Sequence, residues 1–228
     1  MDKISCITIT KNRVHYLKKC ISYYLYQTHE NKELVIIYYN TDPDTEKFLF
    51  DNEEEFTKQN IKFFKFIEDD AIKLGSVRNL ATTKATGDWL AVWDDDDWNC
   101  ETRLEKQLEF CKDNNMIGCT LRSVVIYSCV YRKFLLTFER YEGWECTLFV
   151  RRDKMLKYKN LATGEDTPLV QELLESPTFK TMFNPDLYVY IFHKENVSGV
   201  RHKQNILDAS YDLGVEKTRM LNEKLNLI

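Results

Sequence analysis

The sequence predicts an α/β protein whose central sheet is mostly parallel and is flanked by helices. The first half of the chain alternates between strand and helix patterns four times, which is typical of a parallel sheet with helices on both faces. The strand patterns are short apolar runs rich in β-branched and aromatic residues, as buried strands are. The length of 228 residues suits one domain with a substantial core.

The elements of the first half follow from hydrophobic spacing and turn residues. The first helical pattern places Val14, Leu17 and Ile21 on one face. The turn "NTDPD" separates the second strand from a surface helix rich in lysine and glutamate. The predicted strands cover residues 4–10, 33–39, 61–67 and 89–93. Apart from the surface helix, the predicted helices cover residues 14–25, 76–86 and 101–114.

The second half is less regular and richer in strands. Residues 123–138 predict a hairpin, and residues 146–156 predict a strand that runs into a helix. The segment "TPLVQELLE" predicts a helix with Thr167 as its cap and Pro168 at its first position. A last strand covers 186–192. Because no repeat or linker interrupts the chain, we expect a single domain over residues 1–228.

Composition and charge exclude several classes of protein. The 32 basic and 36 acidic residues give a net charge of −4, which makes nucleic acid an unlikely partner. The 7 cysteines form no CxxC pair, which argues against a zinc site and a disulfide framework and favours free thiols in a reducing compartment. The chain shows no signal peptide and no apolar stretch that could span a membrane, so we expect a cytoplasmic protein without stable membrane insertion.

Four consecutive aspartates, Asp94 to Asp97, follow the fourth strand in "WLAVWDDDDWN". An acidic run is often only a solvated turn. This one, however, lies at the carboxyl end of a strand, where open parallel sheets bind ligands. Crowded carboxylates repel one another unless a cation lies among them, and Mg²⁺ or Mn²⁺ combine oxygen ligands with phosphate oxygens. In a strand-like backbone Asp94 and Asp96 point to the same side, which suits one metal ion that also binds a diphosphate.

Several segments in order resemble the family 2 glycosyltransferases, which have the GT-A fold. "ISCITITKNR" resembles the opening strand and loop of that family, and "YLYQTHENKELVII" is similar to its next helix end and second strand. "KLGSVRNLATTKATGDWLAVWDDDDW" resembles its glycine, Arg-Asn and D-x-D-D segment, and "TGEDTPL" its acidic pair before a helix. The resemblance is strong over about the first 110 residues and patchy afterwards.

The resemblance implies a nucleotide-diphospho-sugar donor, a divalent metal ion (Mn²⁺ or Mg²⁺) and transfer of the sugar to a hydroxyl of a glycan or other acceptor. Residues 1–115 then form the nucleotide-sugar-binding half and 116–228 the acceptor-binding half. The implied donor-binding residues are Thr10, Arg13, Tyr39, Arg78, Asn79, Asp94 and Asp95, and the implied metal ligands are Asp94, Asp96 and His193. For His193 a purely structural role is the alternative.

One position departs from the family pattern. Family members usually carry two aspartates at the end of the second strand, where this chain has Tyr38 and Tyr39. A tyrosine can stack on a base, but it cannot accept a hydrogen bond as a carboxylate does. Asp42 or Asp44 is a candidate replacement for the missing acid. A uridine diphosphate sugar is therefore the default donor and is not deduced from these residues.

Glu165 and Asp166 are the candidate catalytic residues. Acidic residues favour helix N-termini, so capping is the alternative role. With Thr167 as the cap, Asp166 is free, and inverting sugar transfer needs a general base near the acceptor hydroxyl. The resemblance assigns that role to Asp166, with Glu165 as the fallback. Trp144 is either an acceptor platform or a core residue, and the basic side chains Arg201, His202 and Lys203 either cover the phosphates or form a solvated tail.

The acidic residues and the resemblance together predict a metal-dependent glycosyltransferase, and the resemblance implies inversion of the anomeric centre. A nucleotidyltransferase is disfavoured because "TITKNRVHYL" lacks the glycine-rich loop that holds a triphosphate. The other alternative is a non-catalytic domain that binds a sugar nucleotide or a glycan as part of a larger assembly. The departure at Tyr38 and Tyr39 keeps this alternative open, and a turnover test separates the two.

Overall fold

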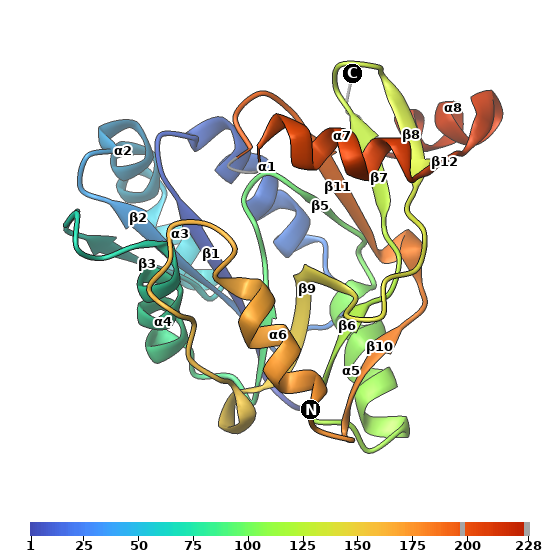
Figure 1. The fold of residues 1–228 in the computed structure, drawn as a ribbon. Coiled ribbons are helices and arrows are strands. Elements are labelled where there is room, and N and C mark those ends of the chain that lie inside the picture. Colours follow the sequence, from blue (N-terminus) through green and yellow to red (C-terminus); the bar gives the residue numbers. More distant parts are fainter. Residues whose placement is uncertain (197–198, 226–228) are drawn as a thin grey trace.

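A seven-stranded sheet forms the centre of the molecule (Figure 1). The computed structural model describes residues 1–196 and 199–225, without the side chains at 200–202 and 224. The strands of this sheet are β1 (Ile4–Thr10), β2 (Lys32–Tyr39), β3 (Ile61–Phe66), β4 (Trp89–Val92), β6 (Gly118–Leu121), β9 (Trp144–Arg151) and β10 (Phe179–Met182). Their order is β10-β6-β9-β4-β1-β2-β3, and only β9 is antiparallel to its neighbours, so the predicted mostly parallel sheet is confirmed.

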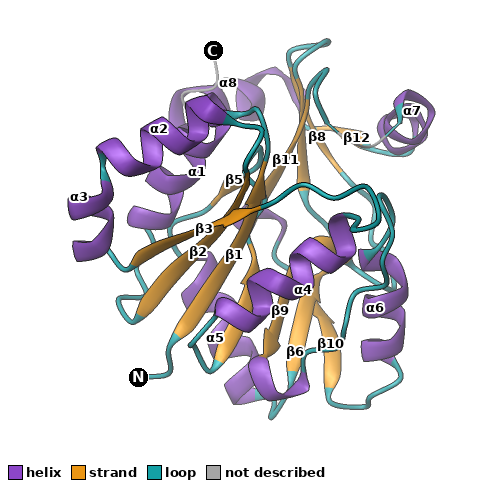
Figure 2. Ribbon diagram, turned by 90° about the vertical axis from the view of Figure 1, so that its left-hand side faces the viewer, coloured by secondary structure: helices purple, strands orange, loops and turns teal. Residues whose placement is uncertain are grey.

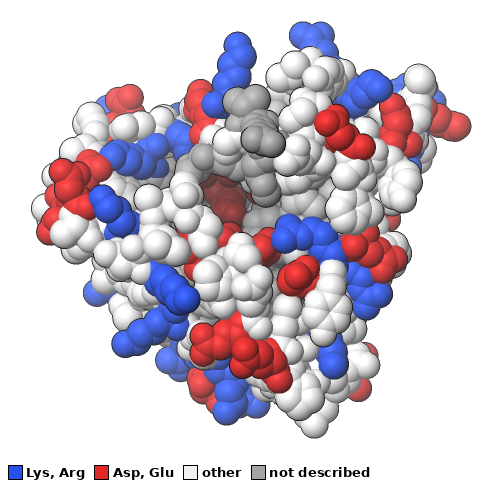
Figure 3. All heavy atoms as spheres, viewed as in Figure 1, with Lys and Arg blue, Asp and Glu red and all other residues white. Residues whose placement is uncertain are grey.

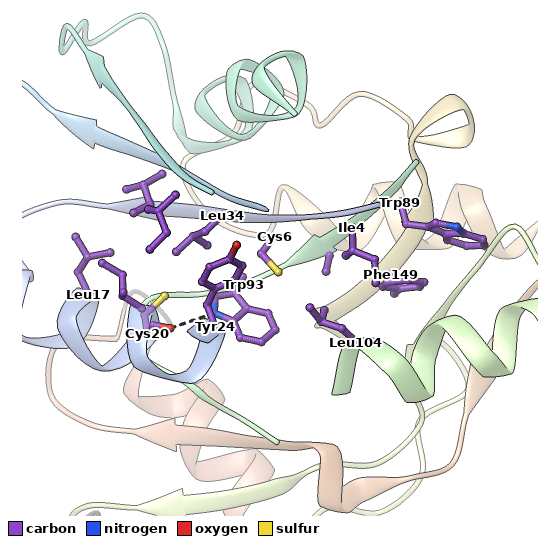
Figure 4. Packing of buried hydrophobic residues seen from close by; sticks show 14 of the residues in the cluster. Ile4, Cys6, Leu17, Cys20, Tyr24, Leu34, Trp89, Trp93, Leu104 and Phe149 are labelled. Atoms are coloured by element: carbon purple, nitrogen blue, oxygen red, sulfur yellow. Dashed lines mark hydrogen bonds between the residues drawn. The ribbon is translucent and has the colours of Figure 1, made fainter. Parts of the chain in front are cut away.

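Helices cover both faces of this sheet (Figure 2). Side chains alternate along a strand, so β4 sends Trp89 and Ala91 to one face and Leu90 and Val92 to the other. The first face packs against helices α1 (Val14–Leu25), α2 (Pro43–Asp51), α3 (Glu53–Lys58) and α5 (Arg103–Asp113), and the second against α4 (Leu74–Lys84) and α6 (Asp166–Leu174). Figure 4 shows the first of these clusters, in which the Trp93 indole N–H donates to the Cys20 carbonyl at 3.4 Å.

A second sheet lies beyond the carboxyl end of β4. Its strands are β5 (Trp98–Asn99), β7 (Val125–Ser128), β8 (Lys133–Leu136), β11 (Tyr188–Phe192) and β12 (Tyr211–Asp212), in the order β12-β8-β7-β11-β5. The antiparallel pair β7–β8 confirms the predicted hairpin. Helices α7 (Val200–Asp208) and α8 (Gly214–Leu225) complete the described chain. Residues beyond 115 supply β6, β9 and β10 to the main sheet, so both halves of the chain share it.

Two local predictions in the second half are wrong. The helix predicted before residue 156 is a single 3₁₀ turn, Arg152–Lys154, after which the backbone extends. Helix α6 begins at Asp166, so Pro168 is its third residue and Thr167 is not its cap. Proline is tolerated there because the first turn has no partner for its N–H groups. The Thr167 hydroxyl donates instead to Glu145 Oε1 at 3.0 Å, a long-range contact that spacing does not reveal.

The parallel strands β1, β2 and β4 bring their carboxyl ends to one edge of the main sheet. In register, Thr10 pairs with Tyr38 across β1 and β2, and Ile7 pairs with Val92 across β1 and β4. The loops after these strands, and after β3, therefore open at the same edge. In the part of the chain that the structure describes, every helix is too short or too polar to cross a bilayer.

Candidate active site

A cleft of about 780 Å³ opens at this edge of the sheet. In Figure 3 it is the hollow near the centre of the face, with acidic side chains at its floor. The loops after β1, β3 and β4 and the last residue of β2, Tyr39, line one part of it, and the segment before α6 lines another. Most predicted site residues line this cleft: Thr10, Arg13, Tyr39, Arg78, Asp94, Asp95, Asp96, Glu165 and Asp166.

The aspartate run lies in a turn and not in an extension of β4. The strand ends at Val92, and the turn begins two residues after Trp93, whose side chain is fully buried. The expectation that Asp94 and Asp96 share one side of a strand-like backbone is therefore wrong. Each of the two acids instead pairs with a different arginine at the floor of the cleft.

Arg13 lies against two of the aspartates. Its two terminal nitrogens lie 3.1 Å from Asp95 Oδ1 and 2.8 Å from Asp96 Oδ2. Burial, followed by repulsion from Asp96, raises the pKa of Asp95 to about 8. Burial also opposes ionisation of Asp96, but hydrogen bonds from His193 and the charge of Arg13 lower the pKa of Asp96 overall. At neutral pH the negative charge therefore concentrates on Asp96.

Asp97 faces the second sheet. Its Oδ1 accepts the Ile191 N–H at 2.8 Å, and its Oδ2 accepts the Tyr188 hydroxyl. Burial and the neighbouring aspartates raise the pKa of Asp97 well above its usual range. Because Ile191 is two residues before His193, these bonds fix the end of β11 beside the aspartate turn.

His193 is placed against Asp96 and is not itself among the residues that line the cleft. Its Nε2 lies 3.1 Å from Asp96 Oδ2, and Asn196 donates to the same oxygen at 3.2 Å. Sequence reasoning missed Asn196, which does line the cleft. Lys203 donates to the His193 carbonyl at 2.8 Å. The side chains of Arg201 and His202 lie outside the described residues.

Arg78 joins the aspartate turn to the acidic pair before α6. Its guanidinium donates to Glu165 Oε1 at 2.8 Å and to Asp94 Oδ1 at 3.2 Å. Burial opposes its charge, but Asp94, Tyr158 and Glu165 together raise the pKa of Arg78 well above its usual value. The guanidinium therefore stays charged at the floor of the cleft.

Asn79 is not among the cleft-lining residues. Its side-chain amide donates to the Tyr158 carbonyl at 2.8 Å and accepts the Tyr158 N–H at 2.9 Å. This clamp holds the segment before α6 against α4. The same close approach requires Gly75, since a Cβ there would lie 1.9 Å from the Lys159 carbonyl oxygen. In this structure the Asn of the Arg-Asn pair thus supports the site from outside the cleft.

Asp166 lines the cleft at the start of α6, and its Oδ1 accepts the Thr167 N–H at 2.9 Å. Burial, followed by the charge of Glu165, raises the pKa of Asp166 to about 6. Glu145 is linked to it through Thr167 and binds both terminal nitrogens of Arg140 at 3.2 Å. Sequence reasoning missed both residues because Glu145 reaches the cleft only through the register of β9, and Arg140, in the loop before β9, pairs with Glu145 there.

Trp144 also lines the cleft, but it is only 4% exposed, and the Arg140 guanidinium lies 5.0 Å from the centre of its ring. The burial of this ring favours the core role that the sequence left open.

The two tyrosines at the end of β2 lie in different environments. Tyr38 is 1% exposed and packs in the core, whereas Tyr39 lines the cleft with Lys11 5.0 Å above its ring. Asp42 is buried, caps α2 through the Thr45 N–H at 3.1 Å and does not line the cleft. Asp44 is exposed on α2 and does not line it either.

Glu68, just after β3, is the acid that lies near Tyr39. It pairs with Lys11, accepts the Thr41 hydroxyl at 2.8 Å and lines the cleft. The sequence pattern did not single it out, because no motif marks the end of β3. Glu68 thus lies where Asp42 and Asp44 were expected.

The donor set of the cleft fits a divalent cation bound together with a diphosphate. Acidic side chains outnumber basic ones among the lining residues: Glu68, Asp69, Asp70, Asp94, Asp95, Asp96, Asp97, Glu145, Glu165 and Asp166 against Lys11, Arg13, Lys73, Arg78 and Arg140. Among the described residues no three His, Cys, Asp or Glu side chains are grouped as a metal cage. Mg²⁺ needs no such cage, since one or two carboxylates and substrate phosphates often suffice.

The structure is an α/β fold with an acidic cleft at the carboxyl ends of its parallel strands, and comparison with known families identifies the class of protein. The model of "Glycosyl transferase family 2" matches residues 5–168. The chain therefore belongs to glycosyl transferase family 2, and the predicted family of enzymes is confirmed.

Curated relatives are also named glycosyltransferases. An uncharacterized glycosyltransferase of Rickettsia bellii is 31% identical over 115 residues, which are 50% of this chain and 16% of the relative. Glycosyltransferase GlyA of Streptococcus pneumoniae is 24% identical over 226 residues, covering 87% of this chain and 32% of GlyA. The chain thus spans less than a third of the length of either relative.

Solved structures show the same fold at low identity. S. aureus TarS 1-349 in complex with UDP-GlcNAc gives a TM-score of 0.69 at 15% identity, covering 87% of this chain and 62% of that one. The mannosyltransferase PcManGT from Pyrobaculum calidifontis, in complex with GDP-Man and Mn²⁺, gives 0.65 at 12% identity, covering 86% and 58%. The expected GT-A fold is confirmed.

Proposed function

We propose that this chain transfers a sugar from a nucleotide-diphosphate sugar to an acceptor hydroxyl, with inversion and with Asp166 as the general base. One observation carries the proposal: Arg78 joins Asp94 of the D-x-D candidate to Glu165, the residue before Asp166, within a single cleft. In this proposal the donor diphosphate binds at the aspartate turn and the acceptor hydroxyl at Asp166, on opposite sides of the anomeric carbon.

The donor is proposed to bind along the carboxyl ends of β1, β2 and β4. Tyr39 offers a ring for the base, and Thr10 and Asp95 line the same cleft. Asp94 and Asp96, with His193 beside them, are the residues that would hold Mn²⁺ or Mg²⁺. Such an ion supplies positive charge to the diphosphate leaving group. The complexes of TarS with UDP-GlcNAc and of PcManGT with GDP-Man and Mn²⁺ support this class of donor.

The chemistry assigned to the chain is charge stabilisation and proton transfer. Arg78 keeps its positive charge at the floor of the cleft, where the leaving diphosphate gathers negative charge. Asp166, with its pKa near 6, is ionised at neutral pH and accepts the proton of the attacking hydroxyl. Glu165 is bonded to Arg78, so it orients the arginine and leaves the base role to Asp166.

The acceptor side is proposed to lie around Arg140 and Glu145, in the half formed by residues 116–228. A glycan or another hydroxyl compound fits this polar end of the cleft, and nucleic acid fits it poorly because acidic side chains predominate. A cytoplasmic location without stable membrane insertion stays a prediction. The identity of the donor nucleotide as a uridine diphosphate also stays a prediction.

A panel of UDP- and GDP-sugars with Mn²⁺ or Mg²⁺ tests the proposal. We expect one donor to raise the melting temperature only when a divalent ion is present, and to be hydrolysed slowly with water as acceptor. Metal-dependent stabilisation without turnover in the presence of candidate acceptors would favour the non-catalytic binding domain. If no donor binds with either ion, the donor-site assignment is wrong.

A further inference from the structure

Tyr16 lies one helical turn after Arg13 in α1 and contacts the ring of His193. Its hydroxyl oxygen lies 3.0 Å from His193 Nδ1, and the two ring centres are 4.5 Å apart. The donor and metal assignments above give Tyr16 no role. Its position 177 residues before His193 keeps the pair out of reach of any sequence motif.

The contacts of Tyr16 close a ring of four side chains. Tyr16 holds Nδ1 of His193, and Nε2 of His193 faces Asp96 Oδ2 at 3.1 Å. Arg13 donates to the same Asp96 oxygen at 2.8 Å, and the Tyr16 N–H donates to the Arg13 carbonyl at 2.9 Å. The first turn of α1 therefore reaches Asp96 twice, once directly and once through the imidazole.

We propose that Tyr16 is a positioning residue that holds the His193 ring with Nε2 toward Asp96. An imidazole on a strand end can turn about its χ2 torsion, whose energy profile is broad, so one anchored nitrogen decides where the other points. The Glu195 N–H also lies 3.2 Å from Nδ1, and the Asn196 side-chain NH₂ group lies 2.8 Å from Nε2, so each ring nitrogen faces a donor group. The importance of this arrangement for donor binding rests on the proposed function.

A hydroxyl group suits this role better than a donor-only or acceptor-only group. It donates to Nδ1 when Nε2 carries the ring proton, and it accepts from Nδ1 when the proton is there. Tyr16 can therefore hold the ring in either tautomer, including the one in which Nε2 is free to bind a cation at Asp96. Groups that orient a histidine in this way commonly decide metal affinity.

Tyr16→Phe tests the proposal because it removes only the hydroxyl and keeps the ring contact. The matched control is Tyr24→Phe in the same helix, which removes a hydroxyl that donates to the Gln59 carbonyl at 3.0 Å, outside the cleft-lining residues. Nitrogen-15 NMR of the histidine rings reports the tautomer of His193 in the unloaded protein. Electron paramagnetic resonance reports Mn²⁺ affinity with UDP or GDP present.

We expect the His193 ring-nitrogen signals of Tyr24→Phe to match those of the wild type, and those of Tyr16→Phe to shift at Nε2 as well as at Nδ1, because the ring is no longer held toward Asp96. We also expect Mn²⁺ affinity to fall about 10-fold in Tyr16→Phe alone. Unchanged His193 signals in a folded Tyr16→Phe protein would overturn the proposal. If the wild type binds no Mn²⁺, the metal part of the proposed function fails, and the ring signals still decide the role of Tyr16.

Discussion

Arg78 Nε donates to Glu165 Oε1 at 2.8 Å, although 87 positions separate the two residues in the chain. The other end of the same guanidinium reaches Asp94 at 3.2 Å. A planar guanidinium fixes the separation of two carboxylates in a way that a flexible ammonium does not. This arginine therefore sets the distance between the aspartate turn and the segment that carries Asp166.

Arg78→Lys is expected to lower kcat/KM for donor turnover about 100-fold, because one ammonium cannot hold both carboxylates and also face the diphosphate. The matched control is Arg152→Lys, since Arg152 donates to the Gly87 carbonyl at 2.6 Å and does not line the cleft. Steady-state kinetics of donor hydrolysis measures both variants. Equal activity of Arg78→Lys and wild type would contradict the assignment.

Asp166→Asn is expected to lower transfer about 1,000-fold while donor affinity is retained, because an amide cannot accept the acceptor proton. In the wild type, the raised pKa of Asp166, about 6, places the acidic limb of the pH profile near that value. Activity should fall tenfold per pH unit below it, since the carboxyl group is then protonated. Rate measurements between about pH 4.5 and pH 8 test this expected fall in activity.

The control for this experiment is Asp153→Asn, an exposed aspartate that pairs with Arg151 outside the cleft. It should leave both the rate and the pH profile unchanged. A profile of Asp166→Asn that keeps the wild-type acidic limb would assign that limb to another group.

Tyr39→Leu is expected to weaken UDP or GDP binding by about 1–3 kcal/mol, the value of one base–aromatic stack. Its neighbour provides a close control, since Tyr38 is buried in the core and Tyr38→Phe leaves the cleft unchanged. Calorimetric titration with each nucleotide measures the difference. Equal affinity of Tyr39→Leu and wild type would place the base elsewhere, with Glu68 as the next residue to substitute.

Local patterns predicted most of the first half, and long-range register decided what they missed. Strands such as β1 and helices such as α1 depend on spacing within about ten residues, which a single sequence displays. The contact between Glu145 and Thr167, by contrast, depends on the antiparallel position of β9 in the sheet. The predicted start of α6 at Pro168 is wrong because the Thr167 hydroxyl, expected to cap the helix, has that distant partner.

The same difference between local patterns and long-range contacts holds for the candidate site. Asp94 to Asp97, Arg78 and Asp166 stood in motifs, so their positions could be predicted. Tyr16 and Glu68 stand in no motif, and they reach the site only because α1 begins beside β11 and because β3 ends beside β2. The contact of Asn79 with Tyr158 could not be read from its motif, because 79 positions separate the two residues.

Glu33 offers a test of stability at the sheet edge opposite the cleft. Its carboxylate is fully buried and accepts hydrogen bonds from Lys3 and Lys62 at 2.7 Å and from Ser5 and the Thr86 N–H at 2.6 Å. Burial opposes ionisation, but the bonds from Lys3, Lys62 and Ser5 hold the pKa of Glu33 well below its usual range. Glu33→Gln should lower the free energy of unfolding by about 3 kcal/mol at pH 7.

The sign of the pH dependence follows from the lowered pKa of Glu33 in the folded state. The carboxylate contributes its full stability above the unfolded pKa of about 4.3, and this contribution is lost as the pH falls below that value. The difference between wild type and Glu33→Gln should therefore shrink in acid, as urea unfolding between neutral pH and acid can measure. Glu54→Gln, which removes a 90% exposed partner of Lys58, should match the wild type at every pH. If the difference in unfolding free energy between wild type and Glu33→Gln did not change with pH, the pKa of the Glu33 carboxyl group would be the same in the folded and unfolded states.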